Sequence, residues 1–165
     1  MTRNRMTSNA AQAVSSIRGQ DAPSEEFKAA TDSEWLGWYR FLPIAFEDYA
    51  GPFYVFFEEG RVVCGFRPRP DHANLYGNVH GGALMAFADY ALSMIGRGLE
   101  REFRSLTVTF SSEFLSPARI DGLLTARGEI TGGGRSLRFV RGTIYCDDQP
   151  VMAFSSTIKQ LKTIG

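Results

Sequence analysis

The chain has 165 residues, of which 44% are apolar and 13% aromatic, which is enough for one domain with a packed core. Eighteen basic and eighteen acidic residues cancel, and this balance argues against nucleic acid or an anionic membrane as the main partner, because both select a basic excess. The only cysteines, Cys64 and Cys146, lie in apolar runs and histidine occurs twice, so we expect no disulfide framework, no metal site and a reducing, cytoplasmic location.

The N-terminal region divides into two parts. Residues 1–23 are rich in Ser, Ala, Asn and Gln, and they predict a disordered or loosely attached tail without the apolar core of a secretory signal. An organelle transit peptide stays open for this Arg-containing start. Residues 24–165 are predicted to form a single domain. Within it, residues 24–50 are predicted to form a helical cover, because the aromatic residues of 24–42 suggest one or two short amphipathic helices ending near Pro43.

Two strands are predicted next, over Phe53–Phe57 and Arg61–Phe66, with a turn at residues 58–60. Prolines at 68 and 70 then break regular structure. The loop over residues 71–79 carries Asn74 towards the following helix. The amide of Asn74 is suited to hold a carbonyl or a water there, and an ordinary turn role is the alternative.

A helix is predicted from about Gly82 to Gly98. Eleven of the thirteen residues from Ala83 to Ile95 are apolar, so we expect this helix to be buried all round, yet it is too short to span a membrane. Asp89 stands in its middle, where an unpaired buried carboxylate costs several kcal/mol. Asp89 is therefore predicted to have a function or a partner.

Gly81 and Gly82 precede the helix and leave its first N–H groups unobstructed, which suits a developing negative charge. An oxyanion site and a carboxylate together suggest acyl transfer or hydrolysis. Gly81 and Asp89 are, however, separated by about 12 Å of helix rise. We therefore expect two antiparallel copies to share each site across a two-fold axis.

Four further strands are predicted over Arg104–Leu115, Asp121–Thr131, Arg135–Cys146 and Val151–Leu161. Their connections are short, which implies antiparallel pairing. The sequence thus predicts an α+β domain in which five or six antiparallel strands curl around one apolar helix.

The spacing of the polar residues resembles a known signature. Asn74 precedes the triplet His80-Gly81-Gly82 by six residues, and Asp89 follows His80 by nine. This pattern resembles the hotdog-fold acyl-CoA thioesterases of the PaaI type, a family in which an antiparallel sheet wraps around a central buried helix. Further segments similar to that family are Ser105–Thr109, Phe114–Ala118 and Gly134–Leu137, and the resemblance extends over roughly residues 51–162.

The resemblance implies roles for the residues of the site. Asp89 is implied to activate water or to attack the thioester directly, and Thr107 to hold the water beside it. His80 is implied to shape the loop before the helix, with a general base as the alternative. The expected oxyanion donor is the N–H group of Gly81 or Gly82, with the Asn74 amide as a further donor. The expected contacts to coenzyme A are Val79, Gly134, Arg135 and Ser136.

The function implied by the resemblance is hydrolysis of acyl-CoA to a free acid and coenzyme A. No cofactor is expected, because coenzyme A is part of the substrate, and the expected assembly is a homodimer or a homotetramer made of two dimers. A hotdog hydratase or dehydratase is an alternative, although the His-Phe-Pro and Asp-x4-His settings of those enzymes do not occur here. A non-catalytic acyl-CoA binding protein is another, and it is expected to lack the acid at Asp89. Several aromatic residues suggest a medium-chain or aryl acyl group: Trp35, Trp38, Phe41, Phe46, Phe53, Tyr54 and Phe87.

Overall fold

The computed structural model describes residues 24–41, 44–101 and 103–161. The predicted tail over residues 1–23 lies outside the described residues. In the described part of the chain, no helix is both long enough and apolar enough to cross a membrane.

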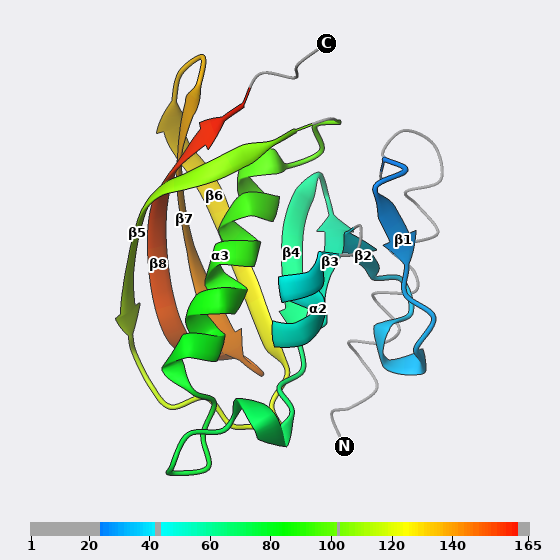
Figure 1. Cartoon of the computed structure of the whole chain (residues 1–165), viewed down its shortest axis with the longest axis vertical. Coiled ribbons are helices and arrows are strands. Elements are labelled where there is room, and N and C mark those ends of the chain that lie inside the picture. Colours follow the sequence, from blue (N-terminus) through cyan, green and yellow to red (C-terminus); the bar gives the residue numbers. More distant parts are fainter. Residues whose placement is uncertain (1–23, 42–43, 102, 162–165) are drawn as a thin grey trace.

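One antiparallel sheet dominates the fold (Figure 1). Its eight strands follow the order β1-β2-β3-β4-β6-β7-β8-β5, and every neighbouring pair is antiparallel. The six strands from β3 onward match the predicted ones, and two short strands at one edge were not expected. The strands are β1 (Phe27–Ala29), β2 (Tyr39–Phe41), β3 (Phe53–Glu58), β4 (Arg61–Phe66), β5 (Ser105–Phe114), β6 (Leu124–Gly133), β7 (Leu137–Cys146) and β8 (Gln149–Gln160).

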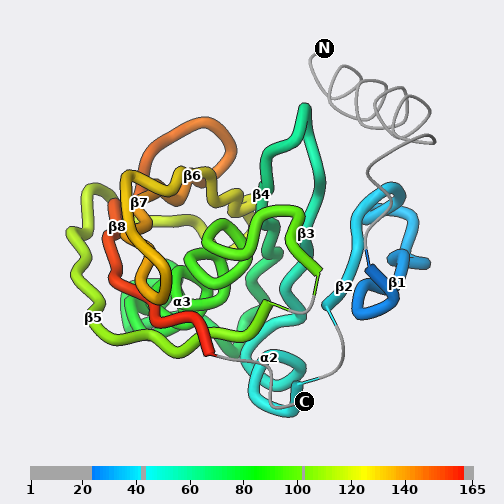
Figure 2. Tube along the Cα trace, turned by 90° about the horizontal axis from the view of Figure 1, so that it is seen from above, coloured from blue at the N-terminus to red at the C-terminus, as the bar shows by residue number. Residues whose placement is uncertain are grey.

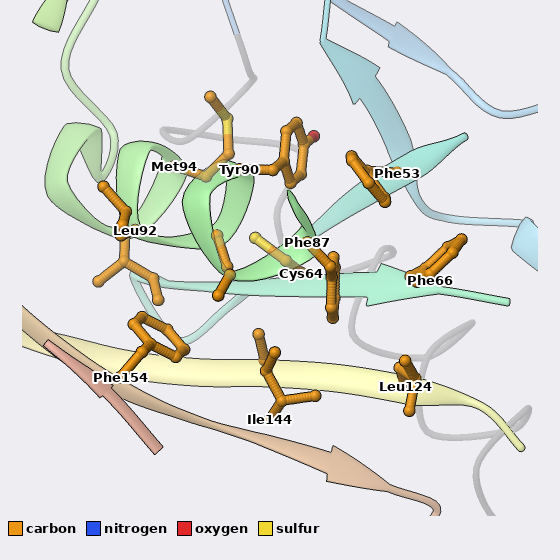
Figure 3. Packing of buried hydrophobic residues seen from close by; sticks show 14 of the residues in the cluster. Phe53, Cys64, Phe66, Phe87, Tyr90, Leu92, Met94, Leu124, Ile144 and Phe154 are labelled. Carbon is orange, nitrogen blue, oxygen red and sulfur yellow. The ribbon is translucent and has the colours of Figure 1, made fainter. Parts of the chain in front are cut away.

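The predicted helix is present as α3 (Gly81–Arg97), and the sheet curls around it (Figure 2). α3 ends at Gly98, whose φ of +58° suits glycine and whose N–H donates to the carbonyl of Met94. Phe87 of α3 lies 5.5 Å, centroid to centroid, from the ring of Phe66 on β4, and Leu92 faces Phe154 of β8 (Figure 3). This arrangement is the predicted hotdog architecture.

One side of α3 is open, so the expectation that the helix is buried all round is wrong for a single chain. Gly82, Met85 and Asp89 are exposed, and Ala86 and Ser93 are partly so. These five residues, called the open stripe below, lie on one face at helical spacing. The curled sheet reaches only the opposite side, where Leu84, Phe87, Ala91 and Met94 are buried.

The N-terminal prediction of helices over residues 24–42 is also wrong. This region forms β1, a 3₁₀ turn η1 (Ser33–Trp35) and β2, and a helix comes only later, as α2 (Ala45–Ala50). The aromatic side chains are used with strand periodicity, because Tyr39 and Phe41 share one face.

The two tryptophans pack on the outer face of the sheet. A Cβ on Gly65 of β4 would lie 2.6 Å from the Trp35 ring and 2.7 Å from the Trp38 ring, so only glycine leaves room for them. Trp35 also stacks on Tyr54, with centroids 4.0 Å apart. Trp35, Trp38 and Tyr54 therefore lie on the face away from α3 and cannot roof a pocket beside Asp89.

Arg97 connects the edge strands β1 and β2 to the end of α3. Its side chain is only 2% exposed and pairs with Glu26, and it donates to the Ser24 hydroxyl at 3.1 Å. Its guanidinium carbon also lies 5.0 Å from the ring centroid of Phe27 and 5.2 Å from that of Phe41. A buried charge with these partners fixes the position of β1.

We predict that Glu26→Gln lowers the free energy of unfolding by about 3 kcal/mol, because it leaves the buried Arg97 charge without its counter-charge. Urea unfolding at pH 7 measures the change. Glu25→Gln is the matched control, since Glu25 is exposed. Equal stability of the two variants would contradict the proposed anchoring of β1.

Candidate active site

Asp89 is held by a neighbour on the adjacent strand. The Thr107 hydroxyl of β5 donates to Asp89 Oδ1 at 2.8 Å, next to a register shift between Thr107 and Thr109. This contact confirms that Thr107 lies beside Asp89. The carboxylate itself is exposed on the open stripe rather than buried. It therefore needs no counter-charge in a single chain, and any shielding from water must come from another molecule.

The first turn of α3 presents one unused donor. His80 is the N-cap: its Nδ1 accepts from the Gly82 N–H at 2.9 Å, and its carbonyl accepts from the Ala83 and Leu84 N–H groups at 2.9 and 3.2 Å. Within the described residues no group accepts from the Gly81 N–H. The Gly82 N–H is thus already paired, so of the two expected donors, Gly81 or Gly82, it is the less available one. Gly81 alone remains available.

The hydrogen bond from the Gly82 N–H also limits what His80 can do chemically. Because Nδ1 accepts from a backbone N–H, the neutral imidazole carries its proton on Nε2. Neither ring nitrogen then has a free lone pair to take a proton from water. The geometry favours the loop-shaping role of His80 over the general-base alternative.

Asn74 is oriented by its own loop. Its Oδ1 accepts from the Tyr76 N–H at 2.9 Å and from the Asn78 N–H at 3.2 Å. Only the oxygen of the amide can accept these bonds, so the orientation of the side chain is fixed and Nδ2 is left as a donor. The loop therefore has both the turn role and a group suited to a carbonyl oxygen.

The residues expected to contact coenzyme A do not lie at the start of α3, beside Gly81. The Gly134–Ser136 turn is exposed and lies near the end of α3 (Figure 1). Just after this turn, the Arg138 guanidinium donates to the Gly96 carbonyl of α3 at 2.6 Å. Gly81 lies at the opposite end of α3. Val79 is 4% exposed and belongs to the core, so its side chain is not available for the expected contact.

In a single chain the Gly81 N–H and the Asp89 carboxylate lie far apart. Gly81 and Asp89 are eight residues apart on a regular helix, which separates them by about 12 Å of rise.

A cavity of about 800 Å³ lies elsewhere, bordered by Arg61, Arg127 and Arg141, and its lining includes neither Gly81 nor Asp89. In the described ranges, no group of three or more His, Cys, Asp and Glu side chains is placed to hold a metal ion.

Sequence reasoning missed Glu47. α2 packs against α3, and Glu47 is half-buried on it. Burial, then the neighbouring carboxylates of Asp48 and Asp89, raise the pKa of Glu47 to about 7. The hydroxyl of Tyr90, next to Asp89 in the chain, is buried without a hydrogen-bond partner in the described structure. No local pattern marks Glu47, because its proximity to Asp89 is purely tertiary.

We predict that Glu47→Gln stabilises the protein at pH 8 and changes little at pH 5. The raised pKa means that the folded state favours the protonated carboxyl, so wild-type stability is greatest below the ordinary value of 4.5 and falls as the pH rises through about 7. Thermal unfolding at both pH values measures this difference. Glu59→Gln, at an exposed turn, is the control, and the same shift in both variants would contradict the prediction.

Comparison with known proteins supports the fold and the family. The model of the Thioesterase superfamily matches residues 76–153. An 80-residue stretch, 48% of this chain, is 25% identical to Acyl-coenzyme A thioesterase 13 of Homo sapiens and of Pongo abelii. It spans 57% of those relatives, so the match covers little more than half of their length.

Solved structures share the hotdog fold. The phenylacetic acid degradation protein PaaI of Thermus thermophilus, in a mutant form, is 23% identical with a TM-score of 0.62, covering 72% of this chain and 100% of that one. A hypothetical thioesterase of Streptococcus pneumoniae with coenzyme A is 22% identical with a TM-score of 0.63, covering 72% and 93%. The resemblance to this group is thereby confirmed. The segment that matches the Thioesterase superfamily, residues 76–153, includes α3 and Asp89.

Proposed function

We propose that the protein hydrolyses acyl-CoA thioesters to a free acid and coenzyme A. The observation that carries this proposal is the open stripe of α3: it displays Asp89, which is bonded to Thr107 of β5, on the helix that begins at Gly81. Among the described residues, the Gly81 N–H has no acceptor. A base and an oxyanion donor are the two groups that thioester hydrolysis requires. The family match and the relatives named as acyl-CoA thioesterases support the same reaction.

The chemistry follows from these groups. The thioester carbonyl oxygen accepts hydrogen bonds from the Gly81 N–H and the Asn74 amide. A water beside Thr107 gives its proton to Asp89 while its oxygen bonds to the acyl carbon. The tetrahedral intermediate then collapses, its C–S bond breaks, and the thiolate of coenzyme A leaves and is protonated. In an alternative first step, Asp89 attacks the carbon and forms an anhydride that water hydrolyses.

The proposed active unit is a homodimer with antiparallel helices, so that Asp89 of one copy faces Gly81 of the other. β5 is suited to the contact, because it is a ten-residue edge strand, whereas the other edge ends in a strand of three residues. Leu106, Val108 and Phe114 of β5 are 59%, 55% and 56% exposed, and Met85 of the open stripe is 43% exposed. Pairing of two such dimers into a homotetramer is part of the same proposal.

Coenzyme A is proposed to lie across the two copies. Arg135 is exposed at the turn near the end of α3, and Arg104 and Lys159 are exposed at the same end of the sheet. In an antiparallel pair this end lies beside the partner's Gly81 half-site, where guanidinium and ammonium groups suit phosphates. The related structures with coenzyme A from Streptococcus pneumoniae and with acetyl CoA from Streptococcus mutans support this class of ligand.

We predict that Asp89→Asn lowers kcat at least about a hundredfold, because it removes the base and keeps the shape of the side chain. Free-thiol release from several acyl-CoAs measures turnover, and thermal unfolding checks that stability is kept. Glu113→Gln, at an exposed site on the other face of β5, is the control. Near-normal turnover in Asp89→Asn would refute the mechanism.

We predict that two inactive variants restore activity when folded together. Gly81→Pro removes the donor at a position where helices accept proline, and Asp89→Asn removes the base. Randomly mixed dimers recover roughly a quarter of wild-type activity, since half are mixed and each of these has one intact site. Verified heterodimers without activity would count against a shared site.

A further inference from the structure

His72 lies at the junction between α2 and α3. It ends the 3₁₀ turn η2 (Pro70–His72), and its Nδ1 accepts from the Arg69 N–H at 2.8 Å. Its carbonyl accepts from the His80 N–H at 2.7 Å. His80 in turn accepts from the Gly82 N–H at 2.9 Å. A continuous series of hydrogen bonds therefore leads from His72 to the first turn of α3, where the Gly81 N–H is presented.

Arg69, which is bonded to His72, also contacts the end of α2. The Arg69 guanidinium donates to the Gly51 carbonyl and, at 3.3 Å, to that of Tyr49, both at the end of α2. The His72 ring is close to the Ala50 carbonyl. Because Nδ1 accepts a hydrogen bond, the proton of the neutral ring belongs on Nε2, which suits donation to that carbonyl.

We propose that neutral His72 is a positioning residue of the active site: it ties α2, which carries Glu47, to the segment that holds the Gly81 N–H in place relative to Asp89. This proposal rests on the proposed thioesterase function. His72 touches no reacting atom. It acts through Arg69 on one side and through His80 on the other.

Charge makes this link sensitive to pH. Protonation of Nδ1 replaces an acceptor by a donor opposite the Arg69 N–H, so the hydrogen bond is lost. Burial and then the Arg69 charge lower the pKa of His72, while the Ala50 carbonyl and Asp71 oppose this shift. The ring of Phe66, 5.0 Å away on β4, adds no charge.

The sign of the effect follows from the lowered pKa. The neutral ring is favoured in the folded state, so its contribution to stability is complete above the ordinary histidine pKa of about 6.5. It is lost as the pH falls through the lower pKa of the folded state. Acidification therefore loosens the oxyanion end of the site by a route independent of Asp89.

Two substitutions separate the positioning role from a merely structural one. In His72→Asn the amide oxygen takes the place of Nδ1 as acceptor and cannot be protonated, whereas His72→Ala removes the acceptor. At pH 8 we expect kcat within about threefold of wild type for His72→Asn, and a loss of about tenfold or more with little change in KM for His72→Ala, since small displacements of catalytic groups are costly. In His72→Asn the acid-side loss of kcat also begins at lower pH.

Imidazole ¹⁵N NMR supplies a readout that does not depend on activity. The sequence contains only two histidines, and the resonances of His72 are those that His72→Asn removes. We expect the Nε2–H tautomer at pH 8 and a titration midpoint below about 6.5.

The outcomes are distinguishable. An Nδ1–H tautomer, a midpoint at or above the ordinary value, or equal losses of kcat in His72→Asn and His72→Ala would overturn the proposal. If His72→Ala does not fold, the tautomer and the pH profile of His72→Asn still decide. If wild type releases no thiol from any acyl-CoA, the proposed function fails, while the NMR result still tests the hydrogen bonds of His72.

Discussion

The packing of α3 in the curled sheet is the constraint on which the rest of the structure depends. A sheet that wraps one helix can cover only part of its circumference, and here it covers the side of Phe87 and Leu92. The remaining side is the open stripe with Asp89. Asp89, the proposed base, is consequently placed where a single chain cannot shield it from water, and the second copy of the proposed dimer would cover it. Fold, site and proposed assembly thus follow from one geometric limit.

At the start of α3, local hydrogen bonding decides which N–H group is left for the proposed oxyanion site. A helix begins with several unpaired N–H groups, and a capping side chain removes some of them. His80 takes the Gly82 N–H and leaves that of Gly81. The Asn74 amide is aimed by two bonds within its own loop. Both arrangements involve a short segment of chain, and in our proposal His72 and Arg69 hold this segment in place.

The two edges of the sheet differ: one is formed by the short strand β1 and the other by the long strand β5. β1 and β2 extend the β3 edge, and Arg97 fixes them through Glu26 and two aromatic rings. This leaves β5 as the long edge strand. An edge strand with exposed apolar side chains favours association. Because β5 also carries Thr107, the edge proposed to join two copies is the one beside Asp89.

The sequence by itself determined the features that depend on local periodicity and spacing. The apolar run and the glycine at its end defined α3, and apolar or alternating runs between turn signals defined β3 to β8. The offset of Asp89 from His80 pointed to the candidate site. Tertiary structure decided the rest. Strands of three residues carry no readable period, so β1 and β2 were mistaken for helices. The pairing of Gly82 with His80, the burial of Val79 and the approach of Glu47 to Asp89 depend on contacts in three dimensions, and the exposure of Asp89 depends on how far one sheet can reach around one helix.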